Sequence, residues 1–135
     1  MNRETLVCEI MRDEAVRLKP YHCTEGKLTI GVGRNLDDRG ISEDEAAYML
    51  ANDLNDCIRE AQCFTWFNEL TDARKRVIVN MIFNLGINRF RKFKKTIEYI
   101  EDRRYVKASI EMMDSKWARQ VGKRADRLSE MMKNG

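Results

Sequence analysis

The sequence predicts an α+β fold in which one helix is followed by a small β-hairpin and then by a mostly helical lobe. Residues 21–36 alternate apolar and polar side chains around several glycines, a period of two that is typical of short strands. Apolar residues elsewhere recur at helical spacing. The 135 residues include one proline and are 43% hydrophobic, which suits a single helix-rich domain with a real core.

The first predicted elements are a helix and a hairpin. Residues 3–13 predict a helix because their apolar side chains fall on one side, and Pro20 cannot continue it. The hairpin follows over residues 21–36, and residues 37–40 form a loop. Three alternate positions of the hairpin are apolar: Leu28, Ile30 and Val32.

The remaining elements are predicted to be helices. Ser42 begins a helix long enough to join two lobes, because Glu45 completes a capping box with it. Thr71 caps the next helix and Gly86 ends it. Its strongly apolar stripe makes it the central helix, and the stripe consists of Ala73, Val77, Ile78, Met81, Ile82 and Leu85. Shorter helices are predicted over residues 94–103, 105–113 and 123–133.

These elements predict one domain, residues 1–135, with two lobes. The hairpin lobe covers about residues 15–45. The helical lobe combines residues 1–14 with about residues 60–135.

Charge is distributed unevenly along the chain, although the net charge is only +3. Residues 37–60 hold eight acidic and two basic residues, residues 86–107 hold eight basic and three acidic, and residues 116–135 hold six basic and two acidic. This predicts a basic C-terminal half that could attract a polyanion such as nucleic acid or bacterial cell wall, or simply ordinary solvated helix faces. Nucleic acid is not the expected partner, since the sequence has no helix-turn-helix signature and no aromatic stacking pattern.

The four cysteines, Cys8, Cys23, Cys57 and Cys63, are predicted to be free thiols. The N-terminus has no long apolar stretch of a secretory signal, so we expect synthesis in a reducing cytosol. No metal or cofactor is expected, because Cys57 and Cys63 do not form a C-x2-C pair and His22 is the only histidine. Apolar runs are too short for membrane insertion.

A candidate active site lies where the first helix ends and the hairpin folds back. Glu14, Cys23 and Thr29 offer a carboxyl, a thiol and a hydroxyl that could face one cleft. Glycoside hydrolysis needs an acid that protonates the leaving oxygen and a second group that delivers water or attacks the anomeric carbon. The spacing alone also allows Glu14 to be a solvated helix-end carboxylate and Cys23 a small buried hydrophobe.

Three blocks of sequence carry a resemblance to a known family. The first runs from Glu14 through Tyr21-His22-Cys23-Thr24-Glu25-Gly26 to Thr29-Ile30-Gly31-Val32-Gly33, the second is Asn80-Met81-Ile82-Phe83-Asn84-Leu85-Gly86, and the third comprises Trp117, Arg124-Ala125 and Arg127. In this order they resemble the active-site segment, central helix and C-terminal lobe of phage-type, T-even-like lysozymes, glycoside hydrolase family 24. The resemblance covers nearly the whole chain and implies a lysozyme-like fold.

The resemblance implies catalytic roles for individual residues. Glu14 matches the family's general acid. Cys23 matches the second catalytic position, which is aspartate in the best-known members and cysteine in some endolysins. Thr29 matches the residue that orients the attacking water or supports the second catalytic group. Arg124 matches an arginine that pairs with the acid across the cleft; the alternative is an exposed helix arginine.

Substrate-binding roles are implied for a further set of residues, although Phe83 and Trp117 could be mainly core residues. The candidates are Glu25, Phe83, Asn84 and Trp117. Three other residues, Asn35, Thr96 and Glu111, fall near family positions tied to sugar binding but carry different side chains.

Two departures from the family pattern stand out. Arg34 replaces a histidine of a well-known member, and the loop before the Ser42 helix is shorter. At the second catalytic position, our hypothesis is that Cys23 acts as a thiolate, either activating water with inversion or attacking the anomeric carbon with retention. His22 or nearby basic residues could lower the pKa of Cys23, although neighbouring residues of a strand point to opposite sides.

The implied function is that of a muramidase, which hydrolyses the β-1,4 bond between N-acetylmuramic acid and N-acetylglucosamine in peptidoglycan. A monomeric endolysin would be made in the host cytoplasm and reach the periplasm and cell wall at host lysis, with the help of a holin. One alternative is a catalytically silent, glycan-binding component of a phage particle. Another is a basic, helical nucleic-acid-binding module.

Overall fold

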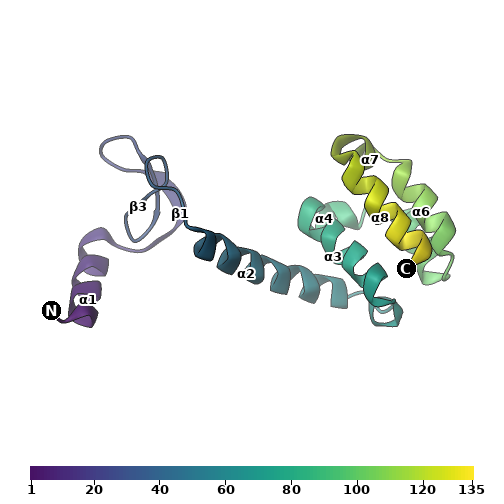
Figure 1. Cartoon of the computed structure of the whole chain (residues 1–135), viewed down its shortest axis with the longest axis horizontal. Coiled ribbons are helices and arrows are strands. Elements are labelled where there is room, and N and C mark those ends of the chain that lie inside the picture. The colour runs from purple at the N-terminus through teal and green to yellow at the C-terminus, as the bar shows by residue number, and fades with distance from the viewer. The chain divides into compact units, whose positions relative to one another are not determined.

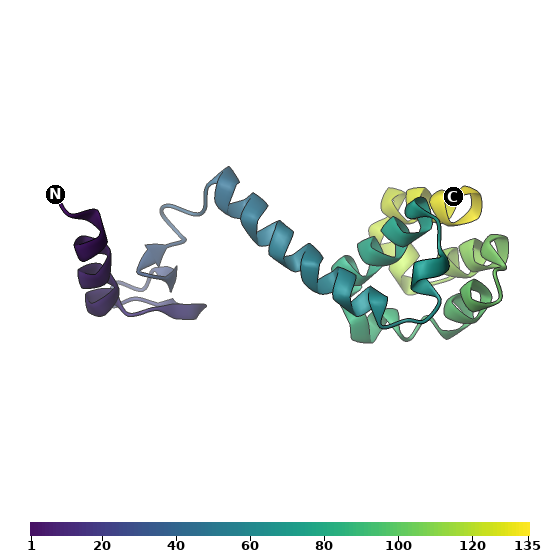
Figure 2. The same cartoon turned by 90° about the horizontal axis from the view of Figure 1, so that it is seen from below.

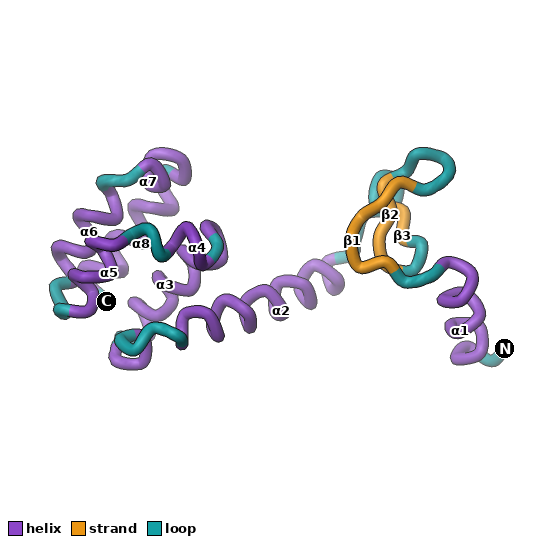
Figure 3. The backbone as a smooth tube through the Cα atoms, turned by 180° about the vertical axis from the view of Figure 1, so that it is seen from behind, coloured by secondary structure: helices purple, strands orange, loops and turns teal.

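The structure, a computed structural model, describes all 135 residues and divides into two compact units. Unit 1 comprises Met1–Tyr48 and unit 2 comprises Met49–Gly135. Figures 1 and 2 follow the chain by colour, and Figure 3 separates helices from strands. One small sheet and many helices confirm the predicted α+β class. The assignment of residues 1–14 to the helical lobe stays a prediction.

Unit 1 begins with the predicted helix, α1 (Arg3–Glu14). Asn2 caps it, because its side-chain oxygen accepts the Thr5 N–H at 2.9 Å. The helix ends where Ala15 takes a positive φ of 60° and donates its N–H to the Met11 carbonyl. Glu14 is therefore the last helical residue.

The predicted hairpin is part of a three-stranded antiparallel sheet in the order β1-β2-β3 (Figure 3). Its strands are β1 (Arg17–His22), β2 (Leu28–Gly31) and β3 (Arg34–Asn35). The first strand starts four residues earlier than the alternation at residues 21–36 predicted. Pro20 fits there because β1 is an edge strand whose pairing with β2 is irregular between Arg17 and Tyr21.

The beginning of α2 (Glu43–Gln62), which crosses the boundary between the units, confirms the predicted capping box. The Glu45 N–H donates to Ser42 Oγ at 3.2 Å, and the Ser42 N–H donates to Glu45 Oε1 at 2.9 Å. Arg34 adds a second contact, with Nη2 at 2.7 Å from Glu45 Oε2 and Nη1 at 2.8 Å from Oε1. Arg34 therefore ties β3 to the start of α2.

This contact makes the start of α2 sensitive to acid. The Arg34 guanidinium, helped by Ser42, lowers the pKa of Glu45 from 4.5 to about 2. A lowered folded-state pKa stabilises the fold above pH 4.5, and this contribution is lost as the pH falls toward 2. We expect an NMR titration of the Glu45 carboxyl to show its midpoint near 2. In Arg34→Ala the midpoint is expected to move toward the ordinary value, and an unchanged midpoint would contradict the assignment.

Unit 2 consists of the rest of α2 and a group of helices. The helices are η1 (Phe67–Glu69), α3 (Asp72–Leu85), α4 (Ile87–Phe90), α5 (Lys94–Glu101), α6 (Tyr105–Met113), α7 (Lys116–Val121) and α8 (Lys123–Asn134). The predicted helices at α3, α5, α6 and α8 are confirmed. Helices η1, α4 and α7 were missed, because such short helices show too little periodicity to recognise.

The core of unit 2 lies around α3. Thr71 caps this helix, its Oγ1 accepting the Arg74 N–H at 3.3 Å. Four residues of the predicted apolar stripe are confirmed as buried: Val77, Ile78, Met81 and Ile82. No helix of the chain combines the length and the apolar character needed to cross a membrane.

Candidate active site

Glu14 lies against the turn between β2 and β3. Gly33 occupies this turn with a positive φ of 66°, and a Cβ built on it would fall 2.7 Å from Glu14 Oε2 and 2.9 Å from its Cδ. Any other residue would be strained at this φ, and its Cβ would push the Glu14 carboxyl away. Gly33 therefore lets the sheet contact the carboxyl, a role that its place in the Thr29–Gly33 motif did not reveal.

Cys23 follows β1 in a tight turn. The Gly26 N–H donates to the Cys23 carbonyl at 2.8 Å, and the Cys23 N–H donates to the Lys27 carbonyl at 2.9 Å. The Cys23 thiol is half-buried. Hydrogen bonds with backbone groups of the same turn, chiefly that of Lys27 and secondly that of Glu25, lower the pKa of Cys23. Burial and the Glu25 charge oppose this effect. The suggestion that His22 lowers the pKa was wrong: the causes lie in the turn.

Thr29 is a buried residue of β2 and lies beside Cys23. Its hydroxyl donates to the Lys27 carbonyl at 2.8 Å. Donation of this hydroxyl to the Cys23 thiol would also lower the pKa of Cys23. A hydroxyl has one proton, so donation to the Lys27 carbonyl and donation to the Cys23 sulfur are alternatives, of which the structure contains the first. The catalytic roles of Glu14, Cys23 and Thr29 stay predictions, but all three belong to unit 1.

The four thiols are expected to differ in reactivity. Turn hydrogen bonds lower the pKa of Cys23, whereas burial, together with the charge of Glu60, raises the pKa of Cys57. Because the thiolate is the reactive form, iodoacetamide should modify Cys23 at a lower pH than Cys57. Tryptic cleavage places each cysteine in its own peptide, so mass spectrometry can follow all four in one sample. Equal pH profiles for Cys23 and Cys57 would contradict this assignment.

Two of the candidate substrate-binding residues of unit 2 are joined to each other. The Trp117 indole N–H donates to Asn84 Oδ1 at 2.7 Å, and the Trp117 ring is 4% exposed. Trp117 is thus largely a core residue that holds Asn84 in place. Phe83 is 41% exposed on unit 2, so it is not part of that unit's core.

A basic groove in unit 2 contains Trp117. It has a volume of about 690 Å³ and also includes Thr96 and Glu111, two residues that the family resemblance placed near the sugar. Five cations line it, none of them in an ion pair: Arg89, Lys92, Lys94, Lys95 and Lys116. Part of the positive charge predicted for the C-terminal half therefore lies along this groove.

Arg124 is half-buried, and its Nε donates to Asn80 Oδ1 at 2.9 Å. It is therefore not a free surface arginine. Pairing of Arg124 with Glu14 stays a prediction, as does substrate binding by Glu25, which is exposed in the turn after Cys23. No group of three or more His, Cys, Asp or Glu side chains is arranged to hold a metal ion.

Comparison with known proteins identifies a family for most of the chain. The family described as phage lysozyme matches residues 11–133. The chain belongs to the phage lysozyme family. Membership supports a glycoside hydrolase activity of the lysozyme type, with peptidoglycan as the substrate that the family implies.

Similar proteins are found in Dictyostelium discoideum and in Enterobacteria phage T4. Probable T4-type lysozymes 2 and 1 of Dictyostelium discoideum are 28% and 27% identical, each alignment covering 91% of this chain and 90% of the relative. The pre-baseplate central spike protein Gp5 of Enterobacteria phage T4 is 25% identical over 93% of this chain, but only 27% of the spike protein is covered.

Proposed function

We propose that this protein is a muramidase that hydrolyses the β-1,4 bond between N-acetylmuramic acid and N-acetylglucosamine in bacterial peptidoglycan. The observation that carries the proposal is that unit 1 holds a carboxyl at the end of α1 against the β2–β3 turn, and a thiol with backbone hydrogen bonds beside a buried hydroxyl. In this mechanism Glu14 gives its proton to the glycosidic oxygen as the bond breaks.

Cys23 supplies the second chemical group in this proposal. The hydrogen bonds of its turn favour the thiolate, which can take a proton from water or form a bond to the anomeric carbon. In the first route the hydroxide attacks directly and the product is inverted. In the second route water later displaces the sulfur, and the product keeps its configuration.

The reaction can be tested on purified peptidoglycan. We expect soluble fragments whose new reducing ends are N-acetylmuramic acid, identified by borohydride reduction and mass spectrometry. Reducing ends at N-acetylglucosamine, or no release at all, would contradict a muramidase.

The role of Cys23 requires a separate measurement. Proton NMR of the first product reports its anomeric configuration, and Cys23→Ala is expected to lose most of the lytic activity. Inversion by the wild type would exclude the covalent route. Full activity of Cys23→Ala would remove Cys23 from the mechanism altogether.

The biological setting of this proposal is host lysis by a phage. The enzyme would accumulate in the host cytoplasm as a monomer and reach the periplasm and cell wall after a holin opens the membrane. The similarity to a central spike protein favours a second setting, in which the chain acts as part of a phage particle. Detection of the protein in purified particles would support the second setting, and detection only in the lysate would support the first.

A further inference from the structure

We propose that Asp37 and Asp38 are positioning residues that hold segment 27–28 so that its backbone faces Cys23 and Thr29. The proposal rests on the role proposed above for Cys23. It concerns the loop between β3 and α2, which lies outside the residues given catalytic or substrate-binding roles above.

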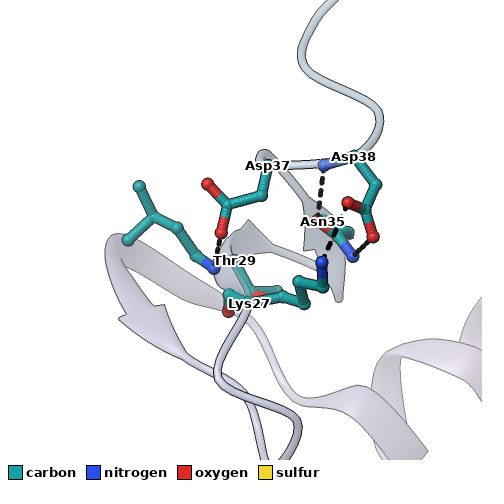
Figure 4. A network of polar contacts seen from close by, with 6 residues as sticks. Lys27, Thr29, Asn35, Asp37 and Asp38 are labelled. Atoms are coloured by element: carbon teal, nitrogen blue, oxygen red, sulfur yellow. Dashed lines mark hydrogen bonds and ion pairs between the residues drawn. The ribbon is translucent and has the colours of Figure 1, made fainter.

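Both aspartates contact segment 27–28 directly (Figure 4). Asp37 Oδ2 accepts the Leu28 N–H at 2.8 Å. Asp38 Oδ1 lies 3.1 Å from Lys27 Nζ. The backbone adds a third contact, in which the Leu36 N–H donates to the Leu28 carbonyl at 2.7 Å. Segment 27–28 is therefore held through three of its own groups: the Leu28 N–H, the Lys27 side chain and the Leu28 carbonyl.

The loop itself is held in shape by Asn35. Its Nδ2 donates to Asp38 Oδ2 at 3.0 Å, and its Oδ1 accepts the Asp38 N–H at 2.9 Å. Side-chain bonds of this type to the backbone stabilise turns. The Asp38 carboxylate thus has one oxygen on Asn35 and the other on Lys27 (Figure 4).

Lys27 is the residue through which the loop reaches the candidate active site. Its carbonyl accepts both the Cys23 N–H at 2.9 Å and the Thr29 hydroxyl at 2.8 Å. Its backbone is also the foremost hydrogen-bonding partner of the Cys23 thiol. If Lys27 moved, the alignment of Cys23 and Thr29 would change together. Asp37 and Asp38 thus act through Lys27 and need not touch the substrate.

Because charged groups surround Cys23, the direction in which its pKa changes when an aspartate is removed distinguishes a charge effect from a positioning effect. Glu25 raises the pKa of Cys23 by its charge, and the Lys27 ammonium is engaged by Asp38. The His22 ring is exposed beside the turn. If the aspartates acted only as negative charges, removing one would favour the Cys23 thiolate. If they position Lys27, removing one disfavours the thiolate, which is the opposite result.

The test is the pH profile of iodoacetamide modification of Cys23, followed in the tryptic peptide that spans residues 18–27. We expect Asp37→Ala and Asp38→Ala to shift the midpoint to higher pH and to slow modification several-fold at neutral pH. Asp37→Asn keeps an oxygen for the Leu28 N–H and should restore the wild-type profile. Glu43→Gln, which loses the same charge from an exposed side chain of unit 1, is the matched control and should change nothing.

Several outcomes would overturn the positioning role. A midpoint that stays in place or moves to lower pH in both alanine variants would do so. So would an Asp37→Asn profile identical to that of Asp37→Ala. Because this measurement does not depend on lysis, it separates the two proposals: a shifted midpoint in a protein that cannot cleave peptidoglycan would refute the muramidase and leave the positioning role intact.

Discussion

Glu14→Gln is expected to lower the rate of peptidoglycan hydrolysis by about 10²-fold to 10⁴-fold, the usual contribution of general acid catalysis. Glutamine has nearly the shape of glutamate, so the close approach of Gly33 to this side chain should be kept. The amide cannot give a proton to the leaving oxygen, and the chemical step therefore loses its acid. The measurement is the release of soluble fragments from purified peptidoglycan at equal enzyme concentrations.

The matched control for this experiment is Glu9→Gln. Glu9 lies on the same helix and is exposed, so its replacement changes the net charge equally without touching the candidate site. Hydrolysis should continue at the wild-type rate in this variant. If Glu14→Gln retained wild-type activity, Glu14 could not be the general acid, and the alternative of a solvated helix-end carboxylate would hold.

Phe90→Ala is expected to destabilise unit 2 by about 3–5 kcal/mol, because truncating a buried phenylalanine loses apolar contact and leaves a cavity. Phe90 is 0% exposed, and its ring centre lies 5.7 Å from that of Phe64, edge to face, and 6.4 Å from that of Phe93. Such a loss is a large part of the typical stability of a domain, about 5–15 kcal/mol.

Urea unfolding followed by the fluorescence of Trp66 and Trp117 measures this loss, since both tryptophans lie in the core of unit 2. Ile110→Ala serves as the control, because Ile110 is 63% exposed and its truncation should cost about 0.5 kcal/mol or less. A loss below about 1 kcal/mol in Phe90→Ala would mean that the helices close the cavity, and that α4 is not a rigid part of the core.

Much of the fold was predictable because its signals are local. The capping box of Ser42 and Glu45 and the Thr71 cap lie within three residues of their partners, and both are present in the structure. The buried stripe of α3 followed from helical periodicity. Helices α4 and α7 were missed because four and six residues are too few to show a period. The early start of β1 was missed because Pro20 resembles a break, although an edge strand tolerates it.

The candidate site divides in the same way. The types and order of Glu14, Cys23 and Thr29 agreed with glycoside hydrolysis but allowed other interpretations, and the family resemblance was carried by three blocks of sequence spread over nearly the whole chain. The source of the lowered Cys23 pKa was not predictable, since backbone amides have no signature in the sequence. Sequence position suggested His22 instead, because it is adjacent in the chain.

The sequence by itself determined the order of the hairpin and the longer helices, the family and the candidates for each chemical role, because these depend on residue types and on spacings within one helix, turn or motif. Only the tertiary structure decided that Gly33 lies against Glu14, that Arg34 pairs with Glu45, that Trp117 holds Asn84, and that Asp37 and Asp38 hold segment 27–28. Each of these contacts joins residues from different elements or loops. Such pairings arise from the way the chain folds back on itself, so residue type and local spacing cannot specify them.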